Sequence, residues 1–291
     1  MKILVGVDGS NQNRAAVGWA LREGRVRGEE VVAAHAWHLP TLVYYAPGYV
    51  PIATDEMADE GTKLLQTIVG GIPDHEDVKV EMRVVHGNAR SALSHIAEEP
   101  TVGTVVVGTR GHGSAPAALL GSVSHGLSHH CPKPLVVVPG SRYGIDLPAS
   151  MRRVLVGVDG SPQADSALRW ATDEAKLHGA LLEIVTAWSW SASPADRAAE
   201  APGGGLEAAA REILQRSVER LPANGVRVHT RVREGMAPAV LLDMAEEADL
   251  LVVGSRGRGR TAEMVLGSTS HQCIHRSPIP VVVVPSAVND A

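Results

Sequence analysis

Two glycine-rich segments contain the residues whose types and spacing point to chemistry. The first reads VVVGTRGHGSAPAALLGSVSHG at residues 105 to 126, and the second reads LVVGSRGRGRTAEMVLGSTSHQ at 251 to 272. Both contain a glycine, two residues, a glycine, nine residues and then a Gly-Ser pair. Glycines let backbone N–H groups approach a ligand closely, and a helix N-terminus adds donors with a partial positive charge. The pattern predicts two sites for a phosphate chain.

Serines and arginines in these segments add further donors. We expect the serine hydroxyls after each Gly-Ser step to help bind an anion, and Arg110 and Arg256 to make charge-assisted contacts. For a single copy an alternative stays open, because Gly-x-x-Gly also forms turns and Gly-Ser also begins helices. Chance predicts about 0.03 matches to the combined spacing per chain, so its presence in both copies favours anion binding.

The segments recur because the chain is a duplicated domain. ILVGVDGSNQNRAAVGWALREG at 3 to 24 matches VLVGVDGSPQADSALRWATDEA at 154 to 175, and the 291 residues suit two domains of ordinary size. Pro, Gly and Ser enrich the stretch between the copies, which predicts an exposed linker. We therefore expect one domain at 1–140, a linker at 141–150 and a second domain at 151–291.

Each copy alternates short apolar runs with helical patterns. In the first copy we expect strands at 2–8, 30–37, 78–85, 103–107 and 134–138, and helices at 11–27, 55–70, 89–98 and from 122 onward. Runs such as TVVVG and LVVVP are apolar throughout, which is typical of strands covered on both faces. The series predicts an α/β fold with two tandem, doubly wound, parallel five-stranded sheets of the Rossmann-like kind.

In such sheets ligands bind beyond the carboxyl ends of the strands, where the strand order reverses. Asp8 and Asp159 follow the first strand of each copy, and Gly108 and Gly254 follow the fourth. These positions should therefore meet in one crevice per copy.

With these motifs the whole chain resembles a tandem universal stress protein. Gly108, Gly111, Gly121 and Ser122, with Gly254, Gly257, Gly267 and Ser268, fit the ATP-binding signature of that family. The resemblance implies an adenine nucleotide α-hydrolase-like fold and one ATP in each repeat. It also implies that Asp8 and Asp159 lie against ribose, phosphate or a divalent ion such as Mg²⁺ or Mn²⁺, and that Ala36 and Ala187 meet adenine through backbone groups.

These considerations give one set of expected ATP-binding residues per repeat. In the first repeat they are Asp8, Ala36, Gly108, Arg110, Gly111, Gly113, Gly121, Ser122, Val123 and Ser124. In the second repeat they are Asp159, Ala187, Gly254, Arg256, Gly257, Gly259, Gly267, Ser268, Thr269 and Ser270. We expect no catalytic residue and no resident metal site.

Other phosphate-binding motifs fit less well. GSRGRGRT at 254 to 261 resembles a Walker A loop, but Arg260 stands where lysine is required and the first repeat lacks the feature. The segments after the first strands contain a single glycine each, so they lack the dinucleotide-binding fingerprint. The expected function is that of an ATP-dependent stress-response sensor or regulator. A slow ATPase or phosphotransferase, and an interaction module that binds ATP only structurally, stay open as alternatives.

Composition limits the partners and the cellular compartment to be expected. A net charge of −5 argues against a nucleic-acid partner, the two cysteines fit inert thiols in a reducing compartment, and no apolar run suits a membrane span. We therefore expect a cytoplasmic protein with an unidentified protein partner. The last strands, near 133–140 and 279–286, should lie at sheet edges and pair the two repeats as an intramolecular pseudo-dimer; homodimerisation of the chain is a further expectation.

Two other features have competing interpretations. His125 and His129 are four residues apart, as are His271 and His275, which suits metal binding but also an exposed polar helix face or a contact between repeats. Tyr44, Tyr45 and Tyr49 suit a partner surface, a lid over the nucleotide or a simple cover on the sheet. We assign neither feature to the expected site.

Overall fold

The chain forms two compact units, Met1–Leu147 and Pro148–Ala291. The computed structural model describes residues 1–10, 13–38, 54–109, 120–140, 150–189, 205–222, 225–257 and 266–285. The three tyrosines discussed above and nearly all of the expected linker lie outside these residues.

The first unit alternates strands and helices as predicted. Its strands are β1 (Lys2–Gly6), β2 (Glu30–Trp37), β3 (Val80–His86), β4 (Val102–Gly108) and β5 (Leu135–Val138). Its helices are α1 (Asn13–Arg27), α2 (Thr54–Gly70), α3 (Ala89–Ala97) and α4 (Ser122–His130), with a short 3₁₀ helix η2 (His75–Asp77). The first strand ends two residues earlier than expected, although Val7 N still donates to Ala34 O over 2.8 Å.

The second unit repeats this order. Its strands are β6 (Arg153–Gly157), β7 (Leu181–Trp188), β8 (Arg227–Glu234), β9 (Leu250–Gly254) and β10 (Val281–Val284). Its helices are α5 (Pro162–His178), α7 (Gly205–Glu219), α8 (Ala237–Ala245) and α9 (Ser268–Arg276).

Each unit contains a parallel five-stranded sheet. The strand order is β3-β2-β1-β4-β5 in the first unit and β8-β7-β6-β9-β10 in the second. In each unit the second and third strands are added on one side of the first strand, and the fourth and fifth strands on its other side. The strand order therefore reverses between β1 and β4 and between β6 and β9. The predicted doubly wound α/β fold is confirmed.

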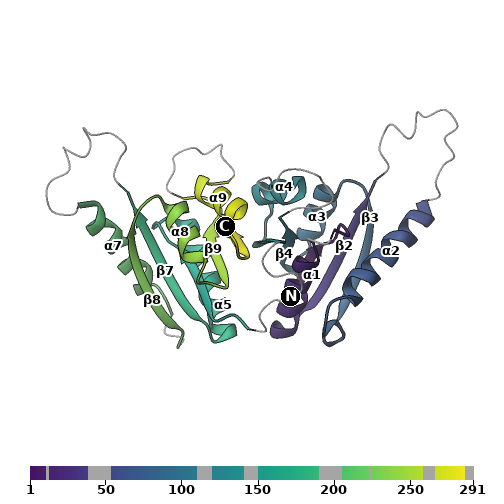
Figure 1. The fold of residues 1–291 in the computed structure, drawn as a ribbon, viewed down its shortest axis with the longest axis horizontal. Helices are drawn as coiled ribbons and strands as arrows, with labels where there is room; N and C mark the ends of the chain where they lie inside the picture. Colours follow the sequence, from purple (N-terminus) through teal and green to yellow (C-terminus); the bar gives the residue numbers. More distant parts are fainter. Residues whose placement is uncertain are drawn as a thin grey trace, which may run out of the picture. The chain divides into compact units, whose positions relative to one another are not determined.

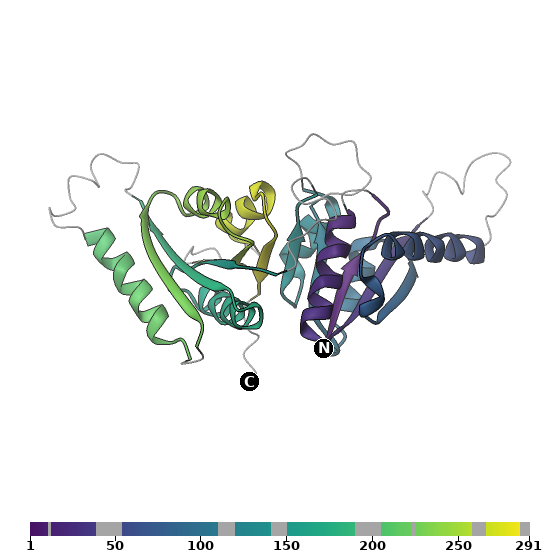
Figure 2. The same cartoon turned by 60° about the horizontal axis from the view of Figure 1, so that its bottom comes forward.

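Helices cover both faces of each sheet. In the second unit α7 packs on β7 and β8 and α5 on β6 and β9, while α8 packs on β7 and β6 and α9 on β9 and β10. Figure 1 labels these elements, and Figure 2 shows α8 and α9, in light green and yellow, on the opposite side of that sheet from α5 and α7. The strands β9 and β10 between the two layers are almost wholly buried, which explains their continuous apolar sequence.

The termini of α5 follow from local chemistry. Ser161 precedes the helix, and its hydroxyl oxygen accepts a hydrogen bond from Ala164 N over 3.2 Å, while Pro162 occupies the first helical position. Gly179 ends the helix with a φ of 63°, a left-handed conformation that glycine adopts without strain. The Ser161 cap and Pro162 fix the turn between the end of β6 and the start of α5.

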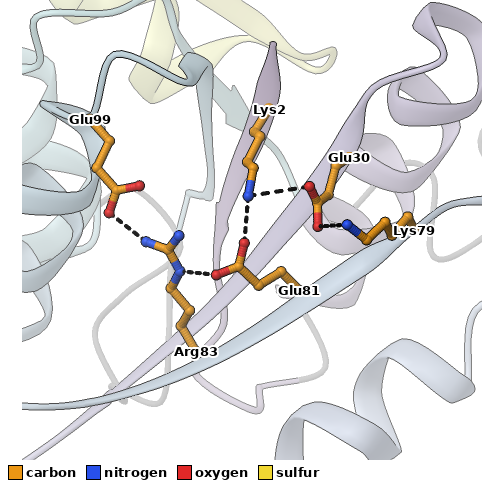
Figure 3. A network of polar contacts seen from close by, with 6 residues as sticks. All are labelled: Lys2, Glu30, Lys79, Glu81, Arg83 and Glu99. Carbon is orange, nitrogen blue, oxygen red and sulfur yellow. Dashed lines mark hydrogen bonds and ion pairs between the residues drawn. The ribbon is translucent and has the colours of Figure 1, made fainter.

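An ionic network crosses the first sheet near the amino ends of its strands (Figure 3). Lys2 Nζ lies 2.6 Å from Glu81 Oε2 and 3.2 Å from Glu30 Oε2. Arg83 joins Glu81 and Glu99 over 2.5 Å each. The Arg83 guanidinium, together with the Lys2 ammonium, lowers the pKa of the Glu81 carboxyl to about 2. This network is remote from the carboxyl ends of the strands, so it serves the fold rather than the expected site.

Both cysteines are free thiols. Cys273 is buried and Cys131 is half-buried, and burial raises the pKa of Cys131 to about 11 and that of Cys273 to about 12. Their thiolate forms are therefore scarce at neutral pH, as expected for inert cysteines. Among the described helices, none combines the length and apolar character that crossing a membrane requires.

Candidate functional site

The end of the first strand forms the same turn in both units. Asp8 Oδ1 accepts a hydrogen bond from Ser10 N over 2.9 Å, and Asp159 Oδ1 accepts one from Ser161 N over 2.9 Å. The glycine inside each turn has a positive φ, 84° at Gly9 and 77° at Gly160, which this tight turn requires. Each turn therefore fixes a carboxylate at the carboxyl end of a strand.

The ends of the glycine-rich segments are joined by one backbone hydrogen bond in each unit. Gly121 N donates to Thr109 O over 2.7 Å, and Gly267 N donates to Ser255 O over 2.7 Å. These bonds bring the start of α4 beside the end of β4, and the start of α9 beside the end of β9. The two halves of the predicted phosphate motif are thus adjacent although a dozen residues separate them along the chain.

The helices that begin here have glycine at their N-caps and no side-chain cap. Gly121 precedes α4 and Gly267 precedes α9, both with extended backbone. The N–H groups of the first turn have no acceptor within their own helix. These N–H groups belong to Ser122, Val123 and Ser124 in the first unit, and to Ser268, Thr269 and Ser270 in the second. Both helix starts are consequently suited to bind an anion.

Two serine hydroxyls at the helix starts bond to carbonyl groups at the strand ends. Ser124 Oγ donates to Gly108 O over 2.6 Å, and Ser270 Oγ donates to Gly254 O over 2.9 Å and lies 3.2 Å from Ser255 O. Both side chains are buried. In this structure these serines tie a helix to a strand end, while their backbone N–H groups belong to the first helical turn.

A cavity of about 360 Å³ lies at the carboxyl ends of the strands in the second unit. Its volume is within the range typical of small-molecule sites. Nine of the ten residues expected for the second site line it: Asp159, Ala187, Gly254, Arg256, Gly257, Gly267, Ser268, Thr269 and Ser270. The tenth, Gly259, lies outside the described residues. Residues up to 111 positions apart in the chain therefore meet around one space.

The glycines of this cavity stand where side chains would collide. A Cβ atom on Gly254 would lie 2.9 Å from the backbone of Gln163, and one on Gly257 would lie 2.6 Å from Asp159 Oδ2. A Cβ on Gly267 would lie 3.3 Å from Arg256 Cα and from Ser270 Oγ. The loop thus approaches the first-strand turn so closely that only glycine fits without displacement.

Charge at the cavity comes from one carboxylate and one guanidinium. Asp159 is half-buried and Arg256 is exposed, and Arg256 has no ion pair with another described residue. An exposed cation beside unpaired helix N–H groups favours an anionic ligand. The neighbouring carboxylate is a hard oxygen donor of the kind that divalent ions prefer.

The sequence reasoning missed the apolar part of the lining. Val158, Val185 and Val253 lie in the carboxyl-terminal half of a strand or just after it, and Ala237 and Leu241 come from α8. The remaining unpredicted lining residues are Gly157, Ala164 and Leu266. Position at the carboxyl end of a strand could have indicated the valines, whereas the contribution of α8 depends on how that helix packs on the sheet.

The first unit has matching geometry wherever it is described. Asp8, Ala36 and Gly108 lie at or just beyond the ends of β1, β2 and β4, while Gly121, Ser122, Val123 and Ser124 begin α4. Arg110, Gly111 and Gly113 lie outside the described residues. The aspartate turn, the loop-closing bond and the serine tie all recur, so the two units share one backbone plan.

Comparison with known proteins identifies this plan. The model of the universal stress protein family matches residues 1–139 and again 151–285. The chain belongs to the universal stress protein family. It is 34% identical to a universal stress protein of Mycolicibacterium smegmatis over 294 residues, which cover 97% of this chain and 96% of the relative. It is 32% identical to one of Mycobacterium tuberculosis over 311 residues, which cover 97% and 94%.

A solved structure extends the likeness to the fold. A universal stress protein from Archaeoglobus fulgidus is 26% identical, covers 99% of this chain and 97% of its own, and gives a TM-score of 0.69. The universal stress protein family model matches this chain twice, once in each unit.

The repeated histidine pairs lie on the helices that follow the glycine-rich segments. The rings of His125 and His129 have centroids 4.7 Å apart on α4, and those of His271 and His275 have centroids 4.3 Å apart on α9. Each pair therefore shares one helix face, as the spacing predicts. Metal binding by these pairs stays untested.

Proposed function

We propose that each repeat binds one ATP and that the protein acts as a nucleotide-dependent regulator of a stress response. The observation that carries the proposal is the cavity in the second unit, which unites nine independently expected residues. Its uncapped helix start, its glycine loop and its exposed Arg256 suit a triphosphate, and its apolar walls suit a nucleoside. The shared backbone plan extends the proposal to the first unit.

Within this site the protein groups have distinct tasks. The N–H groups at the start of α9, with Arg256, would hold the phosphate chain, and Asp159 would contact ribose or a bound Mg²⁺ or Mn²⁺. Val185 and Ala187, at the end of β7, would lie against the base. A divalent ion would neutralise part of the triphosphate charge when bound. Ser270 would act indirectly, by holding α9 against Gly254.

Two measurements test ATP binding. Mass spectrometry of nucleotide released from the denatured protein identifies a co-purified ligand, and calorimetric titration of the stripped chain gives the stoichiometry. Two ATP per chain is the expected result. If the titration detects no binding at millimolar ATP, or only one site, the proposal of one ATP in each repeat is wrong.

A slow ATPase or phosphotransferase is the second candidate. It is favoured by the position of Asp159, whose carboxylate directly adjoins Gly257 of the glycine loop and could orient water or a metal ion near a phosphate. Release of phosphate by the purified chain, absent from a variant that carries both Asp8→Asn and Asp159→Asn, would support catalysis. A nucleotide-dependent change in binding to a protein partner, without turnover, would support the regulator.

The assembly of the two repeats and the cellular location of the protein are further parts of the proposal. We propose that the two repeats pair through their last strands, that the chain further forms homodimers, and that it acts in the cytoplasm. Pairing is testable by cysteine cross-linking between β5 and β10, homodimerisation by light scattering, and location by fractionation of cells.

A further inference from the structure

The strand β8 carries a row of basic residues on one face. Arg227, His229, Arg231 and Arg233 alternate along the strand, so their side chains share one side of the sheet. Contacts with the neighbouring strand establish which side this is: Arg231 Nε lies 2.5 Å from Glu183 Oε1 on β7. The register pairs Glu183 with His229 and Ala187 with Arg233. Arg233 is therefore the neighbour of Ala187 on the face of the sheet that lines the cavity.

The other arginines of this row are already engaged. Arg231 binds Glu183, which also receives Arg153 Nη1 at 3.1 Å, and Arg227 Nη2 donates to Gly179 O over 3.2 Å. Arg233 is exposed and has no hydrogen bond or ion pair with another described residue. It is the member of the row closest to the carboxyl end of β8, which is the end of the sheet where the cavity opens.

The strand order decides which part of a nucleotide Arg233 can reach. Along the carboxyl edge the order is β9, β6, β7 and β8, so the glycine loop after β9 and Arg233 are separated by three strand spacings, roughly 14 Å. Phosphates bound at the loop are beyond the reach of Arg233. One strand spacing, about 4.8 Å, separates it from Ala187, where the base would lie. A guanidinium there can stack on a purine or donate to its ring acceptors.

The first unit lacks this cation. Its register pairs Ala36 with Val85, so valine occupies the place of Arg233. The two units therefore share a backbone plan at this place but differ in the side chain, which is valine at 85 and arginine at 233. From this placement we infer that Arg233 recognises the nucleobase in the second site, and that Val85 takes its place in the first site. The inference rests on the proposed function and adds that the two sites differ at the base.

The experiment separates contact with the base from a general effect of charge. Photolabelling of the full chain with a trace of 8-azido-ATP, followed by peptide mapping, reports the occupancy of each unit. Competition by ATP, or by inorganic tripolyphosphate, then gives an apparent affinity for each site. The variants are Arg233→Val, which copies Val85, Arg233→Lys, which keeps the charge without the planar group, and Val85→Arg, which transfers the feature to the first site.

We expect Arg233→Val to weaken ATP at the second site roughly fivefold to tenfold, with tripolyphosphate unchanged. Arg233→Lys should restore less than half of this loss, and Val85→Arg should strengthen ATP at the first site. An exposed side chain at a strand edge is compatible with folding of all three variants. Labelling of both units confirms that both sites bind in the wild type.

Two results would overturn the inference. If Arg233→Val leaves ATP affinity unchanged while both sites bind, Arg233 serves only to keep the edge of β8 from pairing with other chains. If ATP and tripolyphosphate weaken equally, the residue acts through its charge alone. Failure of the wild type to bind ATP at all is a separate result, which would contradict the proposed function.

Discussion

Gly257 and Asp159 meet so closely that a Cβ atom on the glycine would lie 2.6 Å from Oδ2 of the carboxylate. The first-strand turn and the glycine loop are nearly 100 residues apart in sequence, yet each limits the shape of the other. Glycine at 257 leaves room for the Asp159 carboxylate, which the turn holds in place through Ser161 N. The two motifs of this repeat therefore form one site.

Gly257→Ala should reduce ATP affinity at the second site about tenfold. The added methyl group must displace the Asp159 carboxylate, which is cheaper than moving backbone, so the fold should persist while the site is distorted. Gly205→Ala is a matched control, because a Cβ on Gly205 has no described atom within 4 Å. Calorimetry with circular dichroism checks both variants. Unchanged ATP affinity in Gly257→Ala would show that the Asp159 carboxylate does not contribute to binding.

Ser270→Ala tests the assignment of that hydroxyl to the fold. Its loss leaves the half-buried Gly254 carbonyl without this donor, which should cost about 1 kcal/mol of unfolding free energy. Thermal unfolding of the free protein measures the effect, with the exposed Ser268→Ala as a control expected to stay within about 0.5 kcal/mol. A variant of full stability that has lost ATP binding would instead make Ser270 a direct ligand.

The fold was predictable because its signals are local. The apolar run of β10 lies between Pro280 and Pro285, and strands buried on both faces need no alternation. The duplication then limited which motifs could define the site, since a motif of the shared site had to occur in both copies. The strand-end positions of Asp159 and Gly254 followed from the topology of parallel sheets alone.

Other parts of the site depend on three-dimensional contacts that spacing does not encode. A serine at a helix start can cap, bind an anion or tie a strand end, and only the bond from Ser270 to Gly254 O selects the last role. Leu241 lines the cavity because α8 packs over β6 and β7. The proximity of Arg233 to Ala187 depends on the register of two strands separated by a helix and a long connection.

The network around Glu81 predicts an acid dependence of stability. Its folded pKa of about 2 lies below the ordinary value of 4.5, because Arg83 and Lys2 favour the ionised carboxylate. Its contribution should therefore be complete above about pH 4.5 and disappear as the pH falls toward 2. Solvent screening limits it to about 1 kcal/mol, since all three side chains are partly exposed.

Urea unfolding of the wild type and Glu81→Gln between pH 6 and pH 2 measures this contribution. The stability difference between the two proteins should shrink through this window. Glu60→Gln removes an exposed carboxylate of α2 that has no ion pair with another described residue, and it controls for net charge. A difference between wild type and Glu81→Gln that is constant with pH would show that the carboxylate is not selectively stabilised in its ionised form.

The start of the third helix of each unit offers a paired test of capping. Asn88 caps α3, its side-chain oxygen accepting from Arg90 N over 2.9 Å and from Ser91 N over 3.4 Å, so Asn88→Ala should cost about 1 kcal/mol. Met236 has nearly the same backbone conformation before α8, is 66% exposed and makes no cap bond. Met236→Asn should therefore stabilise the second unit.

The gain from Met236→Asn should be smaller than the loss from Asn88→Ala, about 0.5 kcal/mol, for a specific reason. Pro238 occupies the place of Arg90 and has no N–H, so the new side chain can accept a hydrogen bond only from Ala239. In a chain that already carries Pro238→Ala, the same Met236→Asn exchange should gain about 1 kcal/mol, because both donors are then present. Chemical unfolding of the wild type, the two single variants and the double variant forms a double-mutant cycle. Equal gains with and without Pro238 would mean that the missing N–H does not limit the cap.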